Sequence, residues 1–178
     1  MILLLQYTLI FASVLILVAL GGCFAEHSGV INLGLEGIMI MGALGGALTM
    51  RYVPNTAPAI VMLLAVIVVS ALVGMVYSCL LAVASINFKA DQTLVGTALN
   101  LLGTAGATVI VKAINTAANP DDVSSIVQYG GAKSALLVSI GSFEFNWFML
   151  VAFIALVFAY VTLYKTRFGL RLMACGEH

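Results

Sequence analysis

The stretch PAIVMLLAVIVVSALVGMVYSCLLAVASI, residues 58–86, is a long apolar run in the middle of the chain. It contains no charged residue, and the wider run over residues 52–88 contains none either. A helix needs about 20 apolar residues to cross the hydrocarbon core of a bilayer. Pro58 suits the first turn of a helix, because proline lacks the N–H group that this turn leaves unbonded. The stretch therefore predicts a membrane-spanning helix.

The composition of the whole chain also indicates a lipid environment. Of the 178 residues, 63% are hydrophobic and 8% are charged, and seven basic residues balance seven acidic ones. Soluble domains are about 45–50% apolar and about 25% charged. So few charges cannot cover the surface of a soluble globule of this size. The composition therefore excludes a soluble enzyme, a nucleic-acid-binding protein and a disordered chain.

Other charge-free runs extend the pattern on both sides of this stretch. They predict an all-α fold class, a polytopic helical membrane protein with about five transmembrane helices and a broken segment near residues 26–32. No basic residue precedes the first run, unlike in a signal peptide, so we expect this run to be retained as a span. The five expected segments cover residues 2–22, 33–50, 58–86, 93–112 and 146–164.

Basic residues predict which ends of the segments face the cytoplasm. We take the C-terminal end of the last segment as cytoplasmic, because a basic cluster follows it. Each earlier segment then reverses the side. This places Lys89 inside, and it places Arg51, the loop at residues 115–145 and the N-terminus outside. The alternative is that the polar break makes the first 50 residues re-entrant. In either case we expect one transmembrane domain over residues 1–178. The cluster that marks the cytoplasmic end, after the last segment, is Lys165, Arg167 and Arg171.

Polar residues that lipid tolerates poorly lie first in EHSGVINLGLEG, residues 26–37. An acid at the membrane centre costs ~2.5–3.5 kcal/mol on insertion scales. The residues therefore indicate a cavity lined by protein, or else an ordinary polar turn in which Asn32 is the N-cap of the next helix. Asn32 and Glu36 are four residues apart and would share a helix face. Both interpretations stay open at this point.

A second polar group lies in KADQTLVGTALN, residues 89–100. Gln92, Gly96 and Asn100 recur every four residues and would form one polar stripe along a helix. Such a stripe needs partners in neighbouring helices or in a bound solute, and the spacing does not choose between them. Asp91 lies where an acid stabilises the helix dipole, so its plainest role is structural.

The sequence contains no catalytic, metal-binding or cofactor-binding pattern that we recognise. The three cysteines lack paired spacing, and the glycines do not follow a strand as they do in nucleotide-binding folds. We therefore expect no enzyme activity, and an energy source on another chain or in an ion gradient. Gly42 and Gly46 instead predict close packing between helices.

Three motifs, in this order, resemble those of bacterial ABC-transporter permeases. They are residues 26–37 continuing to 43, residues 89–100, and TRFGLRLMACGE at residues 166–177. The similarity is greatest to the nucleoside-uptake branch of the branched-chain amino acid and simple-sugar permease family, and it covers nearly the whole chain. Permeases of this family usually continue beyond a cytoplasmic coupling loop. The resemblance therefore implies a truncated permease in which residues 165–178 begin that loop.

The resemblance also implies a function, a location and partners. Two permease subunits would form a pathway in the bacterial plasma (inner) membrane, cytoplasmic ABC ATPases would bind at the coupling loops, and an extracytoplasmic solute-binding lipoprotein would deliver a nucleoside. The scarcity of basic residues in the spans suits a small neutral solute. Together with the polar stripes, the motifs indicate a pathway near Asn32, Glu36, Gln92 and Asn100. The residues expected to couple to the ATPase are Arg171, Gly176 and Glu177.

Two alternative functions stay open. A permease of the same family could import a simple sugar or a branched-chain amino acid, because the motifs favour nucleosides only moderately. An ion-coupled carrier or small channel belongs to a different class of protein. There Glu26, Glu36 and Asp91 would be the coupling carboxylates.

Overall fold

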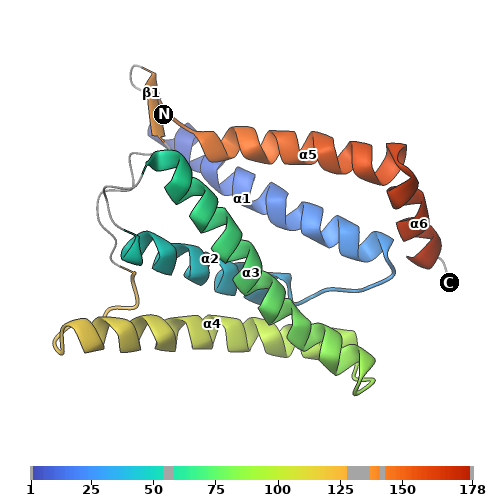
Figure 1. The fold of residues 1–178 in the computed structure, drawn as a ribbon, viewed down its shortest axis with the longest axis horizontal. Helices are drawn as coiled ribbons and strands as arrows, with labels where there is room; N and C mark the ends of the chain where they lie inside the picture. The colour runs from blue at the N-terminus through green and yellow to red at the C-terminus, as the bar shows by residue number, and fades with distance from the viewer. Residues whose placement is uncertain (1, 54–57, 128–136, 141–142, 177–178) are drawn as a thin grey trace. The chain divides into compact units, whose positions relative to one another are not determined.

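A computed structural model describes residues 2–53, 58–127, 137–140 and 143–176 of the chain (Figure 1). Its elements are mostly helices, and their order along the chain is interrupted by one pair of short strands. They are α1 (Ile2–His27), α2 (Leu35–Tyr52), α3 (Ala59–Ile86), α4 (Gln92–Ala118), β1 (Leu137–Ile140), β2 (Phe143–Asn146), α5 (Trp147–Lys165) and α6 (Arg167–Gly176).

The predicted fold class, a polytopic helical membrane protein, is confirmed. Each of the five predicted segments coincides with one of the helices α1 to α5. Within the described ranges, α1, α3 and α4 are long and apolar enough to cross a membrane. The helices α5 and α6 are bent by 72° relative to each other, and they count as a fourth span when taken together. The break expected near residues 26–32 is present, since α1 ends at His27 and α2 begins at Leu35.

Helix α4 is longer than the sequence indicated. It continues to Ala118, whereas the prediction ended at residue 112 and placed residues 115–145 in a loop. Asn119, directly after the helix, is extended (φ −145°, ψ 113°). The residue before a proline is disfavoured in the helical region, so Pro120 explains why the helix ends here.

The expected loop also contains the strands β1 and β2. They pair antiparallel, with Leu137 opposite Asn146 and Ile140 opposite Phe143. Other parts of the expected loop, residues 128–136 and 141–142, lie outside the described ranges. The external location of this loop stays a prediction.

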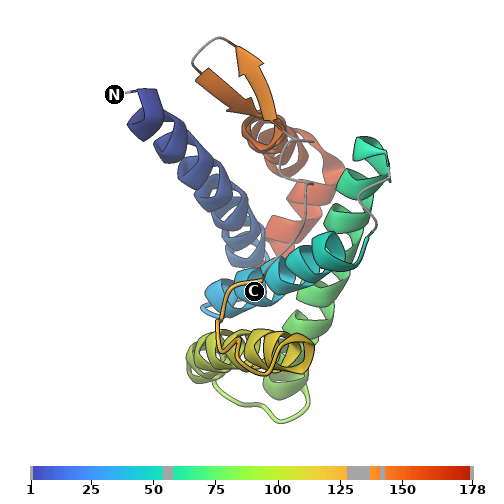
Figure 2. The same ribbon diagram turned by 90° about the vertical axis from the view of Figure 1, so that its left-hand side faces the viewer.

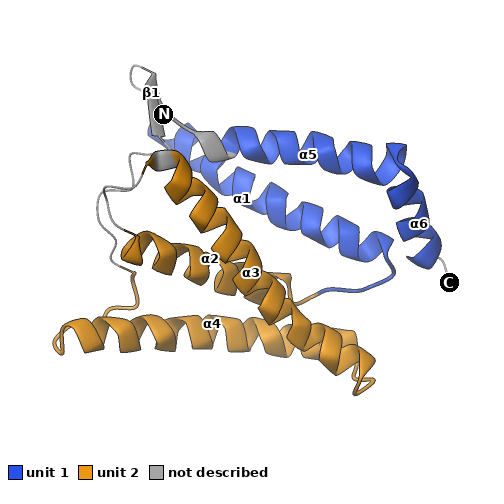
Figure 3. Cartoon of the chain, viewed as in Figure 1, with its two compact units in different colours: residues 1–32, 133–178 blue, residues 33–132 orange. Residues whose placement is uncertain are grey.

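The chain forms two compact units (Figure 3). Unit 1 comprises residues 1–32 and 133–178, and unit 2 comprises residues 33–132. In unit 1, α1 packs along α5, and α6 contacts both helices. In unit 2, α2 packs against both α3 and α4, and α2 and α4 lie side by side in both views (Figures 1 and 2). The expectation of one transmembrane domain remains a prediction.

The close packing predicted from Gly42 and Gly46 is confirmed, because both glycines are buried against α3. A Cβ atom at Gly42 would lie 3.2 Å from the Ser70 carbonyl oxygen, and one at Gly46 would lie 2.5 Å from the Ser70 hydroxyl oxygen. Any larger residue would push α2 away from α3. This face of α2 therefore fixes the distance between the two helices.

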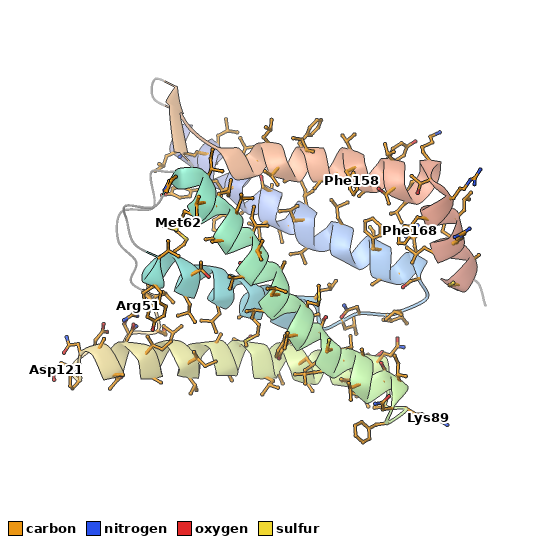
Figure 4. The ribbon with its side chains drawn as sticks, in the orientation of Figure 1. Arg51, Met62, Lys89, Asp121, Phe158 and Phe168 are labelled. Atoms are coloured by element: carbon orange, nitrogen blue, oxygen red, sulfur yellow. The ribbon has the colours of Figure 1, made fainter. Side chains whose placement is uncertain are left out.

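Large apolar side chains point outward on the long helices of both units. Val76 on α3 is 70% exposed, and Phe158 on α5, labelled in Figure 4, is 68% exposed. In a soluble bundle such side chains would lie in the core. Their exposure fits helices whose outer surfaces contact lipid.

Candidate functional site

The two polar groups predicted from the sequence meet at the start of α2. The Gly37 N–H donates a hydrogen bond to the Asn100 side-chain oxygen (2.8 Å), and the Asn100 amide nitrogen donates to the Leu33 carbonyl oxygen (2.8 Å). The first N–H groups of a helix have no partner within that helix. Asn100, on α4, therefore does for α2 what an N-cap side chain normally does.

Glycines allow α2 and α4 to approach this closely. A Cβ atom at Gly37 would lie 2.6 Å from the Leu99 carbonyl oxygen, and one at Gly96 would lie 2.9 Å from the Gly34 nitrogen. A Cβ atom at Gly103 would lie 2.9 Å from the Gly37 α-carbon. These distances are shorter than ordinary van der Waals contacts, so backbone meets backbone at this crossing.

The interpretation of Asn32 as the N-cap of the next helix is wrong. Helix α2 begins at Leu35. Its N-cap residue is Gly34, which has no side chain that could cap the helix. Asn32 therefore lies before the helix and does not share a helix face with Glu36, contrary to expectation. The physical reason is that Asn100 supplies the acceptor from the neighbouring helix, so no local cap is required.

The other predicted residues of this region lie at helix starts. Glu36 is exposed in the first turn of α2, where a negative charge is favourable. Gln92 is half-buried at the first position of α4. The structural role expected for Asp91 is confirmed, since its carboxylate accepts hydrogen bonds from the backbone N–H groups of Thr93 (2.7 Å) and Leu94 (3.3 Å).

A shallow cavity of about 410 Å³, open to the surroundings, lies between α2 and α4, and Thr104 and Thr108 are exposed in it. Thr104 and Thr108 line it from α4, Ile40 and Leu44 are among the residues that line it from α2, and residues 125–127 form a third wall. The two threonines continue the four-residue spacing of Gln92, Gly96 and Asn100. The sequence-based prediction ended the stripe at Asn100 and missed them, although the same spacing could have found them.

The hydroxyl groups of both threonines bond to their own helix. Thr104 donates to the Asn100 carbonyl oxygen (2.9 Å), and Thr108 donates to the Thr104 carbonyl oxygen (2.8 Å). A hydroxyl group carries one proton and two lone pairs. With the protons engaged, both oxygens remain acceptors toward the cavity.

Asn115 holds the third wall in place. Its side chain is 2% exposed, its oxygen accepts a hydrogen bond from Arg51 (2.6 Å), and its nitrogen donates to the carbonyl oxygens of Ser124 (3.0 Å) and Ile126 (2.9 Å). Figure 4 shows Arg51 near the C-terminal end of α4, with Asp121 just beyond that end. The sequence predicts a loop at residues 115–145, so this cluster of hydrogen bonds on α4 could not be predicted.

In unit 1, the first and third motifs come together. Gly29, in the turn after α1, has a φ of +79°, a left-handed conformation that favours glycine. A Cβ atom at Gly29 would lie 3.0 Å from the Gly176 α-carbon, and one at Gly176 would lie 2.6 Å from the His27 carbonyl oxygen. The last turn of α6 therefore rests directly on the turn that ends α1.

Aromatic residues fix the same end of unit 1. The rings of His27 and Tyr164 meet edge to face, with centroids 5.9 Å apart. The His27 Nδ1 atom lies 2.7 Å from the Cys23 carbonyl oxygen and donates to it, which leaves Nε2 to accept from the Tyr164 hydroxyl (3.4 Å). Of the expected coupling residues, Arg171 is exposed on α6, and Glu177 lies outside the described residues.

The helix directions are those of a chain that crosses the membrane back and forth, and which end faces the cytoplasm stays a prediction. In unit 2, Gly37 lies beside Asn100 and Arg51 beside Asn115, so α2 and α4 run in the same direction. Lys89, just before α4, is therefore at the opposite end of the unit from Arg51. In unit 1, α1 and α5 also run in the same direction.

No group of three or more histidine, cysteine or acidic residues that could hold a metal ion is found among the described residues. The cysteines Cys23, Cys79 and Cys175 are free and exposed. The polar side chains of both units instead bond to backbone groups and to each other. Among the described residues, these polar side chains line a space and link helix ends.

The chain is similar to permeases of known transport systems. A family model described as "Branched-chain amino acid transport system / permease component" matches residues 4–178. The guanosine ABC transporter permease protein NupQ of Bacillus subtilis is 37% identical over 177 residues, which cover 96% of this chain and 54% of NupQ. The nucleoside ABC transporter permease protein NupC of Lactococcus lactis is 32% identical over 173 residues, with 96% and 54% covered.

A third relative carries a different solute in its name. The putative glucose ABC transporter permease protein TsgC13 of Haloferax volcanii is 37% identical over 105 residues, which cover 57% of this chain and 29% of that protein. No solved structure matches the chain.

The chain spans about half the length of the first two curated relatives, 54% of each. The two relatives named first are permease proteins of ABC transporters, and the apolar helices of this chain agree with a multi-pass membrane protein. The family model covers almost every residue, and the three ordered motifs lie within it. The chain belongs to the family of permease components of branched-chain amino acid transport systems.

Proposed function

We propose that this chain is part of the permease subunit of an ATP-driven ABC importer that takes up nucleosides. The observation that carries the proposal is the similarity over 96% of the chain to a guanosine permease and to a nucleoside permease. The cavity between α2 and α4 supports it, because its walls carry hydroxyl groups and no charged side chain. Such walls suit an uncharged solute that forms hydrogen bonds.

The proposed partners are membrane lipid, a second permease subunit, a cytoplasmic ABC ATPase and an extracytoplasmic solute-binding lipoprotein. We propose that Arg171, Gly176 and Glu177 couple the permease to the ATPase. The contact between Gly176 and the turn at Gly29 supports this role. A displacement of α6 would reach the break between α1 and α2 through that contact.

We also propose that Asn32, Glu36, Gln92 and Asn100 lie near the solute pathway. Glu36 is exposed at the start of α2. Asn100 bonds to the α2 backbone with both polar atoms of its side chain, so it would shape the pathway and not release its amide to the solute. The four-residue spacing from Asn100 to the cavity-lining Thr104 supports a common face of α4.

Uptake of radiolabelled guanosine tests the proposed function. Cells that carry the complete gene and its ATPase gene should take up guanosine, and unlabelled adenosine should compete while ribose and leucine do not. A matched strain without the ATPase gene should lose the uptake. Guanosine uptake that persists unchanged in that strain would refute an ATP-driven importer.

A simple sugar or a branched-chain amino acid is the second candidate solute, and the similarity to a putative glucose permease over 57% of the chain favours the sugar. Calorimetric titration of the partner lipoprotein with guanosine, glucose and leucine separates the candidates. Binding of glucose without guanosine would reverse our preference. For the ion-coupled carrier, collapse of uptake by an uncoupler while ATP is maintained would be the supporting result.

A further inference from the structure

We infer that the cavity between α2 and α4 is a solute-contact site, in which Thr104 and Thr108 accept hydrogen bonds from an uncharged solute rich in donors. We further infer that Asn115 is a positioning residue that holds the third wall of this site. The inference rests on the proposed function, because it names where the imported solute touches the permease.

The size and lining of the cavity define the class of solute. Its volume of about 410 Å³ lies in the range of small-molecule sites, about 300–1,000 Å³. The lining is apolar apart from the hydroxyl groups of Thr104, Thr108 and Ser125, and it includes no charged residue. The lining offers an ion no charged partner. The site therefore suits a neutral solute with an apolar surface and a few polar groups.

The direction of the threonine hydrogen bonds further limits which class of solute fits the site. Each hydroxyl proton is engaged by a carbonyl oxygen of α4, so each oxygen offers only lone pairs to the cavity. The two oxygens lie one helical turn apart, about 6 Å along the axis at 1.5 Å per residue. They match a solute with N–H or O–H donors at both of its ends. The base amine and the sugar hydroxyl groups of a nucleoside meet this requirement.

The third wall of the site depends on Asn115, which does not itself line the cavity. Its amide nitrogen holds the carbonyl oxygens of Ser124 and Ile126, and Arg51 engages its oxygen. Replacement by aspartate would retain an acceptor for Arg51 and remove both donated bonds. The Asn115→Asp variant would therefore loosen residues 124–127 selectively.

Transport kinetics of the complete transporter test the threonine pair. Valine has nearly the shape of threonine without the hydroxyl group, so the double variant Thr104→Val/Thr108→Val should raise the KM for guanosine about tenfold. The Thr104→Ser/Thr108→Ser variant should have a KM close to that of the wild type, because serine retains the hydroxyl group. Thr97→Val is the matched control, because Thr97 also bonds within α4, to Thr93, and does not line the cavity. An unchanged KM in the valine double variant, at equal membrane abundance, overturns the site.

A second measurement is independent of transport rate. In a background with Cys23, Cys79 and Cys175 replaced by serine, a Thr108→Cys variant is treated with a thiol reagent in membranes. Guanosine should slow the modification several-fold, and the protection should weaken when Asn115→Asp is added. Equal rates with and without guanosine contradict the inference.

The outcomes separate the site from the proposed function. If the intact transporter imports guanosine and the valine variants behave like wild type, the site is wrong and the function stands. If the transporter imports glucose and not guanosine, the proposed solute is wrong, and the same variants are measured with glucose. A raised KM for glucose then supports the site, and an unchanged KM refutes it.

Discussion

Asn100 links the two polar motifs, because its side chain, in the second motif, bonds to the backbone of the first. Its side chain replaces the local N-cap that α2 lacks, and it holds the Leu33 carbonyl oxygen at the same time. The sequence predicted a polar face that includes Asn100, with neighbouring helices or a solute as possible partners. Only the structure identifies the partner as the α2 backbone, because that partner is 63 residues away along the chain.

The Asn100→Ala variant should destabilise the protein. It leaves the Gly37 N–H and the Leu33 carbonyl oxygen without the partner they now have, at a cost of about 1–3 kcal/mol. The purified transporter should therefore have a lower Tm by differential scanning fluorimetry. The Asn100→Asp variant keeps the acceptor for the Gly37 N–H, so its Tm should lie between that of the wild type and that of Asn100→Ala. A Tm equal to wild type in Asn100→Ala would contradict the capping role.

The glycine crossing makes a second prediction at this scale. A methyl group at Gly37 would meet the Leu99 carbonyl oxygen at 2.6 Å, so Gly37→Ala should destabilise the protein by about 1–3 kcal/mol. Gly106, on α4, is the matched control, because a Cβ atom there meets nothing within 4 Å. Gly106→Ala should leave stability unchanged or raise it through helix propensity. Thermal unfolding that ranks the two variants in the opposite order would refute the crossing.

Helix α4 and the strands β1 and β2 show where prediction from the sequence ended. The polar residues from Lys112 to Asn115 predict that the helix ends there. Helix α4 continues instead, because the side-chain amide of Asn115 donates hydrogen bonds to the segment that follows the helix. The strands β1 and β2 were not predicted, although both contain apolar residues. The polar residues of the stretch favoured the prediction of a loop over that of strands this short.

Helix α6 makes a prediction about coupling. The charge reversals Arg171→Glu and Glu177→Lys, and the substitution Gly176→Ala, should impair solute-stimulated ATP hydrolysis more than solute binding. The glycine variant acts by steric conflict, because its Cβ atom would lie 2.6 Å from the His27 carbonyl oxygen. Cys175→Ala, at an exposed neighbouring position, is the control. ATP hydrolysis by the reconstituted transporter is measured, and wild-type stimulation in all three variants would refute the coupling role.

At the scale of the whole molecule, charge placement predicted the membrane orientation, and the helix directions within each unit agree with it. The end of unit 2 that carries Arg51 and Asp121 is predicted to face outward, and Lys89 inward. The sequence could support this much because the basic residues lie between long apolar runs. It could not predict which helices share a unit, because such contacts depend on residues far apart in the chain.

Cysteine labelling checks the orientation directly. In a background without native cysteines, a membrane-impermeant maleimide should label Asp121→Cys in intact cells. Lys89→Cys should be labelled only after the membrane is permeabilised. Labelling of Lys89→Cys in intact cells, with Asp121→Cys protected, would reverse the topology.

Reconstitution in proteoliposomes tests the proposal that the complete permease imports nucleosides at the expense of ATP. The complete permease is reconstituted with its ATPase, its lipoprotein is added outside, and accumulation of labelled guanosine is followed. We expect accumulation that requires ATP and the lipoprotein, and that unlabelled adenosine inhibits. Absence of guanosine accumulation, or accumulation that proceeds without ATP, would contradict it.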